Sequence, residues 1–266
     1  MSCVLHTTVD SSPGRRLALC FMAPAISQRG SRVFLRVFPL AVSACLIACA
    51  GPADGVAALQ SSTPPQGALA ATYRGDATFY DATGGGACGD NPVSDLHVAA
   101  LAEPSWNGAA FCGACAEVTG PKGRTFVRIV DRCPECLDAS LDMGKPAFAE
   151  LDKLDVGRLP ITWKLANCPV QGPLSYFLVA GSSQYWLGLR VRNHKVPVAR
   201  VEIEVGGTFV ALERKPWNDF VIEGGPKTES SFRVRVTSWN GEALTDTLPG
   251  PRSSVTFQGA KNFAPM

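Results

Sequence analysis

The sequence predicts a mainly β protein built from two successive domains that meet near residue 170. Short strand candidates separated by turn residues fill residues 72–170. Residues 172–266 alternate strongly between apolar and polar side chains and contain no cysteine. All cysteines of the chain lie before residue 170, so the change in cysteine content coincides with the change in pattern.

In the first domain we expect strands at residues 77–80, 125–130 and 161–166. Glycine-rich stretches at 84–86 and 120–123 predict loops. One amphipathic helix is predicted over residues 146–154, because Phe148, Leu151 and Leu154 recur at helical spacing.

The second domain carries hairpin signals. Apolar residues alternate with Glu202 and Glu204 until Gly206-Gly207 reverses the chain into a strand at 208–212. A second alternating run, 232–236, ends before an Asn240-Gly241 turn. Turns every 8–12 residues predict a β-sandwich over residues 171–266.

The charge distribution argues against nucleic acid as a partner. The chain of 266 residues is 46% apolar and 18% charged, with a net charge of +2. Residues 1–71, 72–171 and 172–266 carry net charges of +3, −4 and +3. No segment has the dense basic patch of a nucleic-acid-binding protein, so we expect no nucleic-acid partner.

The first 50 residues read as an export signal. Arg29, Arg32 and Arg36 precede an uncharged run at 37–50, which is too short to span a bilayer as a helix. LIAC at 46–49 resembles a lipobox, in which Cys49 would be lipidated, whereas ACA at 48–50 equally fits ordinary signal cleavage. Residues 51–71 have the composition of a flexible linker. We therefore expect a secreted protein, with anchoring to the cell envelope through Cys49 as the alternative.

Export affects the interpretation of the remaining cysteines. An even number in an exported domain indicates disulfides, here three. CGAC at 112–115 and CPEC at 133–136 would also fit a zinc site, which is the rival interpretation. The six residues are Cys88, Cys112, Cys115, Cys133, Cys136 and Cys168.

Two carboxylates and two hydroxyls are candidates for a glycan site. Asp131 ends a strand and Asp142 follows eleven residues later, so that both carboxylates could face one cleft, as general acid chemistry on a glycosidic oxygen requires. Turn or helix capping is the structural alternative for both. Thr78 and Tyr80 share one face of a strand and could bond a sugar, although any half-buried strand offers such a pair.

Aromatic residues in the second domain suggest a sugar-stacking surface. Leu187, Leu189 and Val191 define an inward face, which leaves Trp186 outward beside Gly188, Arg190 and Arg192. Tyr185 has the inward phase unless the chain bends before it. Trp217 lies in a polar, turn-like context. A core position remains the alternative for both tryptophans, and His97 and His194 are interpreted as structural or surface residues.

Together these motifs resemble the bacterial expansins over residues 72–262. The resemblance implies a six-stranded double-psi β-barrel related to family 45 endoglucanases, followed by an immunoglobulin-like family 63 carbohydrate-binding module. It implies wall loosening without hydrolysis or a cofactor. The matching motifs are ATFY at 77–80, GACG at 86–89, CGAC at 112–115, VDRCP at 130–134, SLDM at 140–143 and VRNHK at 191–195.

The resemblance also assigns residues. It places Thr78, Asp131 and Asp142 in the loosening groove, with Tyr80 beside them, and it puts Cys133 where many relatives have an aromatic residue. The polysaccharide platform becomes Tyr185, Trp186 and Trp217. The implied disulfides are Cys88–Cys112, Cys115–Cys168 and Cys133–Cys136. Partners are cellulose and matrix glycans such as xyloglucan, with pectin and peptidoglycan as further candidates, and the protein is expected to be a monomer.

Two other functions compete with non-hydrolytic loosening. One is a glycoside hydrolase or lytic enzyme on cellulose or peptidoglycan, and the other is a carbohydrate-binding protein with an inert barrel. A hydrolase needs a second working carboxylate. Ala82 stands near the position of the family 45 base, and Asp81, one residue away, is predicted to point away from the groove.

Overall fold

The computed structural model describes residues 67–90 and 92–266. The expected signal at 1–50, the lipidation candidate Cys49 and most of the linker 51–71 lie outside the described residues. The described part is mainly β, as predicted. None of its helices is long and apolar enough to cross a membrane.

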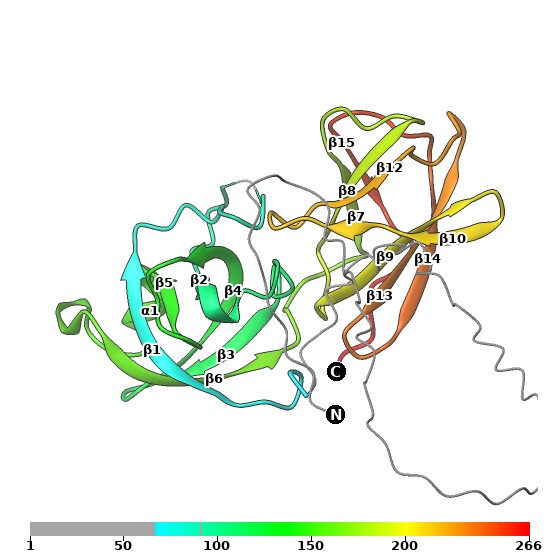
Figure 1. The fold of residues 1–266 in the computed structure, drawn as a ribbon. Helices are drawn as coiled ribbons and strands as arrows, with labels where there is room; N and C mark the ends of the chain where they lie inside the picture. Colours follow the sequence, from blue (N-terminus) through cyan, green and yellow to red (C-terminus); the bar gives the residue numbers. More distant parts are fainter. Residues whose placement is uncertain (1–66, 91) are drawn as a thin grey trace, which may run out of the picture. The chain divides into compact units, whose positions relative to one another are not determined.

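The first six strands close into a barrel in the order β1-β5-β2-β4-β3-β6 (Figure 1). The pairs β1/β5 and β2/β4 are parallel, and the other neighbours are antiparallel. Each predicted strand of this domain is present. The strands are β1 (Tyr73–Tyr80), β2 (Val98–Ala102), β3 (Cys115–Thr119), β4 (Arg124–Cys133), β5 (Leu141–Gly144) and β6 (Leu159–Ala166).

Alternation along the barrel strands fills the barrel interior. In β6 every second residue is buried, including Trp163, whose indole N–H donates to the Ala139 carbonyl at 2.7 Å. Tyr73 stacks on Trp163 with ring centroids 4.0 Å apart. A strand that alternates in this way buries one face while the other stays polar.

The predicted helix at 146–154 is too long. Helix α1 (Lys145–Ala149) begins with Pro146 in its first turn, and Phe148 is fully buried as expected. The helix ends at Ala149, where the bonding tightens to three-residue steps: Glu150 N–H donates to the Ala147 carbonyl at 3.3 Å and Leu151 N–H to the Phe148 carbonyl at 2.9 Å. Leu154 begins a separate 3₁₀ turn, η2 (Leu154–Val156), and is 38% exposed. Another 3₁₀ turn, η1 (Glu103–Ser105), follows β2.

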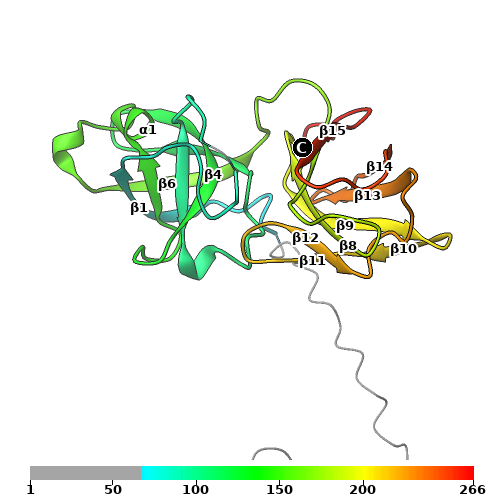
Figure 2. The same cartoon turned by 90° about the horizontal axis from the view of Figure 1, so that it is seen from above.

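Nine further strands form two antiparallel sheets, of order β10-β9-β13-β14 and β11-β12-β8-β7-β15 (Figure 2). The predicted hairpins at Gly206-Gly207 and Asn240-Gly241 are both confirmed. The strands are β7 (Ser175–Leu178), β8 (Trp186–Arg192), β9 (Val198–Val205), β10 (Thr208–Ala211), β11 (Glu213–Arg214), β12 (Phe220–Glu223), β13 (Phe232–Ser238), β14 (Ala243–Leu248) and β15 (Val255–Gln258).

A buried polar contact joins the two sheets. The hydroxyl of Tyr176 on β7 donates to Oδ2 of Asp246 on β14 at 2.6 Å. The other Asp246 oxygen accepts the backbone N–H of Ala260 at 2.8 Å. Burial and the adjacent carboxylate raise the pKa of Tyr176, so its hydroxyl remains a donor.

Three disulfides are present, and their pairing is the one that the family resemblance implies. They are Cys88–Cys112, Cys115–Cys168 and Cys133–Cys136. Within residues 67–90 and 92–266, no group of His, Cys, Asp or Glu side chains is arranged to hold a metal ion.

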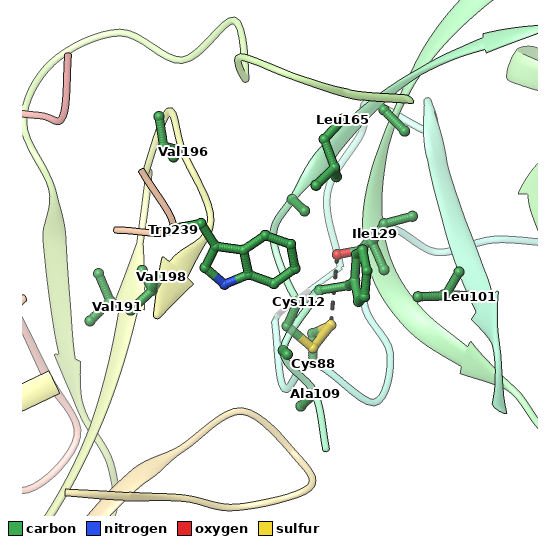
Figure 3. Packing of buried hydrophobic residues seen from close by; sticks show 14 of the residues in the cluster. Cys88, Leu101, Ala109, Cys112, Ile129, Leu165, Val191, Val196, Val198 and Trp239 are labelled. Atoms are coloured by element: carbon green, nitrogen blue, oxygen red, sulfur yellow. Dashed lines mark hydrogen bonds between the residues drawn. A yellow bond between two sulfur atoms is a disulfide. The ribbon is translucent and has the colours of Figure 1, made fainter. Parts of the chain in front are cut away.

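The barrel and the sheets belong to one compact unit and contact each other at residues 109–113. Trp239 meets Phe111 edge-on with ring centroids 5.0 Å apart, and Figure 3 shows its indole directed toward the barrel residues around Cys112. Arg214 donates to the Ala109 carbonyl at 3.2 Å. Gly113 has a φ of +73°, and a Cβ there would lie 2.5 Å from the His194 ring, so only glycine fits. His194 is therefore a structural residue, as predicted.

Candidate functional site

A groove on the barrel brings the two predicted carboxylates together. It has a volume of about 180 Å³ and is formed by residues from β1, β2, β4 and β5 and by the loop that follows β4. The lining residues are Tyr80, Ala100, Asp131, Arg132, Cys133, Pro134, Glu135 and Asp142.

Strand pairing explains why the acids meet. Ala100 on β2 is the neighbour of both Asp131 on β4 and Asp142 on β5. Its methyl side chain leaves space between them. The β2/β4 pairing shifts between Ala99 and Ala100, where Val130 is skipped. Such a bulge re-aims side chains, and here it is associated with both carboxylates lining one groove.

The two acids are held in different ways. Asp142 accepts a hydrogen bond from the Thr78 hydroxyl at 2.6 Å, across the parallel pair in which these residues are direct partners. Asp131 accepts the backbone N–H groups of Ala87 at 2.7 Å and of Arg132 at 2.8 Å. A Cβ on Gly86 would lie 2.4 Å from Asp131, so a glycine is required for this close approach.

Tyr80 lines the groove, but its hydroxyl points into the protein. Burial, together with the negative charges of Asp131 and Asp142, raises the pKa of Tyr80 to about 12. Its hydroxyl is buried and has no hydrogen-bond partner among the described residues. The groove therefore presents the carboxylate acceptors of Asp131 and Asp142, which can bind the hydroxyl groups of a sugar, and Tyr80 contributes its ring to the wall.

The disulfide loop adds a carboxylate that the sequence did not single out. Glu135 lies between Cys133 and Cys136 and is exposed at the groove. Asp81 does not line the groove: its side chain is 88% exposed and accepts from the Lys145 ammonium at 2.5 Å.

Tyr185 and Trp217 are the most exposed of the predicted platform residues, at 73% and 52%. Strand alternation predicted that Tyr185 points inward. It is exposed instead because the chain turns at residues 180–184, before β8 begins. Trp186 is half-buried, since its ring lies over Gly188, where a Cβ would come within 2.8 Å of it. Its indole N–H donates to Glu223 at 3.3 Å.

The outward face predicted beside Trp186 is wrong for Arg190. Arg190 is buried and pairs with Asp219 at 2.6 Å, and its guanidinium lies against Gly89 of the barrel. Strand alternation predicted that Arg190 is exposed, but Asp219 and Gly89, which are distant in the sequence, cover it. Burial of this charge is tolerated because its ion pair compensates it.

The two histidines are bonded differently. His97 is bonded on both nitrogens, to Asp95 and to Glu150, each at 3.0 Å. These carboxylates, Glu150 first, raise the pKa of His97. Burial, followed by the charges of Arg128 and Arg214, lowers the pKa of His194 to about 3.

Comparison with curated proteins returns expansins, although no family model matches. Expansin-YoaJ of Bacillus subtilis is 34% identical over 202 residues, which cover 73% of this chain and 84% of that protein. Expansin-like protein 2 of Dictyostelium discoideum is 30% identical over 211 residues, covering 74% of this chain and 51% of that one. Expansin-A26 of Oryza sativa is 29% identical over 209 residues, which cover 71% of this chain and 70% of that protein.

Solved structures agree with these relatives. The apo crystal structure of a Clavibacter michiganensis expansin is 31% identical and superimposes with a TM-score of 0.65, covering 74% of this chain and all of that one. A mutant of that expansin, crystallised with cellohexaose, matches with the same identity, coverage and TM-score.

Proposed function

The chain belongs to the expansins, and we propose that it binds cellulose and matrix glycans and loosens their noncovalent contacts without hydrolysis. The observation that supports this proposal most directly is the groove, in which the positioned carboxylates of Asp131 and Asp142 offer hydrogen-bond acceptors to a glycan.

The fold can be assigned more finely within this proposal. We assign the barrel to the double-psi class related to family 45 endoglucanases and the two sheets to an immunoglobulin-like family 63 carbohydrate-binding module. The mixed parallel and antiparallel closure of β1–β6 supports the first assignment, and the two antiparallel sheets support the second.

Cellulose binding is assigned to Tyr185, Trp186 and Trp217. Exposed flat rings bind the apolar faces of pyranose units by stacking, and two of these rings are largely exposed. The Clavibacter michiganensis relative crystallised with cellohexaose supports a glucan ligand.

Loosening follows from exchange of hydrogen bonds. A neutral hydrogen bond contributes about 0.5–1.5 kcal/mol net, and one to a charged group contributes about 1.5–3 kcal/mol. The carboxylates of Asp131 and Asp142 can therefore replace the hydroxyl–hydroxyl bonds of a glucan chain at a favourable free energy. The glycosidic bond is left intact in this mechanism.

The test is creep of a stretched, heat-inactivated wall, with reducing sugars measured in the same sample. Creep without sugar release is the expected result. Creep separates loosening from an inert binding protein, and sugar release separates loosening from hydrolysis.

Hydrolysis remains a second candidate because Glu135 lines the groove together with Asp142. An inverting hydrolase uses an acid and a base about 6.5–9.5 Å apart, with a water between them. Soluble oligosaccharides that form with the wild type and disappear in both Asp142→Asn and Glu135→Gln would favour this candidate.

We further propose export of the protein, with the mature chain acting as a monomer outside the cell. The leader pattern supports export, and Cys49 is the candidate for acylation. Xyloglucan, pectin and peptidoglycan remain candidate matrix partners beside cellulose. The mass of the mature N-terminal peptide distinguishes a diacylglyceryl-cysteine from a simply cleaved terminus.

A further inference from the structure

A second and larger cavity lies between the outer side of the barrel and the sheets. Its volume is about 430 Å³, which is within the range of about 300–1,000 Å³ typical of small-molecule sites. It shares no lining residue with the groove and contains none of the platform aromatics. The lining residues are Gly84, Asp90, Val93, Asp95, His97, Val98, Gly113, Arg128, Val130, Val191, Arg192, Asn193, His194 and Asn218.

The barrel wall of this cavity follows from alternation along β4. Val127 and Ile129 point into the barrel and are fully buried. Arg128 and Val130 have the opposite phase and point out of the barrel. Val130 is nevertheless buried, and its carbonyl accepts the backbone N–H of Cys88 at 3.0 Å.

Most charges in the cavity wall already have partners. Asp90 accepts from Arg192 at 3.0 Å, and Asp95 is bonded to His97 at 3.0 Å. Arg128 is half-buried and forms no ion pair or side-chain hydrogen bond with any residue in 67–90 or 92–266. Its positive charge acts on both Asp95 and His194, so it lies within electrostatic reach of both walls. A half-buried guanidinium without a carboxylate partner is a site for an anion.

The opposite wall supplies neutral polar groups. His194 is a neutral part of this wall: its Nδ1–H donates to the Val196 carbonyl at 3.0 Å, and its Nε2 lies against Gly113. The side chain of Asn218 makes no hydrogen bond with the described residues. Asn193 uses its amide N–H groups on two backbone carbonyls and keeps its oxygen available. Val93, Val130 and Val191 add apolar surface.

We propose that this cavity binds a carboxylate-bearing pyranose, that is, a uronic acid unit of an acidic polysaccharide. Arg128 takes the carboxylate in the bidentate geometry that guanidinium groups prefer. Asn218 and Asn193 bond the ring hydroxyls, and the valines contact the apolar ring face. Asn218 follows Trp217 directly in the chain, so one loop supplies both a wall of this cavity and a residue of the platform.

The test is isothermal titration of the mature protein with digalacturonate, with galactobiose as the neutral probe and acetate as the simple anion. Arg128→Gln removes the cation from the cavity. Arg124→Gln is its matched control, since it removes the same charge from the same strand and face at an exposed position. Asn218→Asp places a negative charge in the opposite wall, with a residue type that tolerates the φ of +65° found there.

We expect saturable binding of digalacturonate that falls at least about tenfold in Arg128→Gln and in Asn218→Asp and is unchanged in Arg124→Gln. Acetate should bind far more weakly than digalacturonate. Thermal melting of each variant establishes that it is folded, and Arg128→Lys retains the charge if Arg128→Gln does not fold.

Three results would overturn the proposal. Equal losses in Arg128→Gln and Arg124→Gln would mean nonspecific attraction to net charge. Equal affinity for galactobiose would make the cavity a neutral-sugar site. Absence of saturable binding at millimolar digalacturonate would exclude a uronate site. Each result is independent of wall creep, so the proposed loosening function is tested separately.

Discussion

The hydroxyl of Thr78 donates to Oδ1 of Asp142 at 2.6 Å across the parallel pair β1/β5. Direct pairing of the two residues fixes this contact through the backbone as well as the side chains. The second carboxylate oxygen has no partner among the described residues and lines the groove. Asp142 is thus oriented by the barrel and offers an acceptor to a glycan.

Asp142→Asn should abolish wall creep while cellulose binding persists. The amide keeps the shape and can still accept from Thr78, but it loses the charge that makes its hydrogen bonds strong, about 1.5–3 kcal/mol each. Creep extension and cellulose binding are measured on the same preparation.

Asp81→Asn is the matched control for that variant. Asp81 carries the same side chain one residue beyond β1, yet it is exposed and paired with Lys145 outside the groove. Its substitution should leave creep unchanged. Equal creep by wild type and Asp142→Asn would remove the groove from the loosening mechanism.

Trp217→Ala and Tyr185→Ala should each weaken cellulose binding with little effect on stability. Both rings are largely exposed, and each stacked ring contributes about 1–3 kcal/mol by analogy with aromatic stacking on bases. Depletion of protein by crystalline cellulose gives the affinity. Phe126→Ala removes an exposed ring from the barrel wall instead, and binding should not change. Trp186→Ala should lower both affinity and stability, because this ring packs over Gly188.

Unchanged cellulose binding in the double variant of Tyr185 and Trp217 would show that the platform is not the main binding surface.

The strands could be predicted from the sequence because their signals are local. The alternation around Glu202 and Glu204 and the Gly206-Gly207 turn specify β9 and β10 without any other part of the chain. The length of α1 could not be predicted in this way. The apolar spacing continues to Leu154, but the helix ends at Ala149, and the Leu151 carbonyl beyond it accepts the backbone N–H of the distant residue Lys122 at 3.1 Å.

The residues of the groove could be named from the sequence, but the contacts that position them could not all be predicted. Thr78, Asp131 and Asp142 could be named from motifs, whereas the β2/β4 bulge beside Ala100 has no sequence signal. Arg190 has an outward strand phase and is buried only because Asp219 and Gly89 cover it. Long-range coverage of this kind is not encoded in local periodicity.

Removing individual disulfides should destabilise the protein in the order of the loops they close. In the chain-entropy description, Cys115–Cys168, with a sequence separation of 53, contributes about 4 kcal/mol, and Cys133–Cys136, with a separation of 3, about 2 kcal/mol. Urea denaturation of the paired serine variants measures the difference.

A thiol count on denatured, unreduced protein should find none of the six cysteines free. Six free thiols with stoichiometric zinc would contradict the disulfides.

Acidification should destabilise the folded protein through His194. Burial, with the charges of Arg128 and Arg214, lowers its folded pKa to about 3, whereas the unfolded side chain titrates near 6.5. Above pH 6.5 both states are neutral and the stability is complete. As the pH falls below 6.5, His194 becomes protonated in the unfolded state but stays neutral in the folded state, so the free energy of unfolding decreases.

The expected loss is about 2 kcal/mol between pH 6.5 and pH 5, measured as the shift of the urea midpoint. His194→Asn removes this dependence and retains a side-chain N–H that can donate to the Val196 carbonyl.

His97→Gln is a control in which the pH dependence should change in the opposite direction. Its hydrogen bonds to Glu150 and Asp95 raise the pKa of His97, so that histidine adds stability at low pH which is lost as the pH rises through its folded pKa. Its removal should steepen the acid destabilisation. A wild-type midpoint that stays constant from pH 7 to pH 5, or an equal shift in His194→Asn, would show that His194 is protonated in the folded protein.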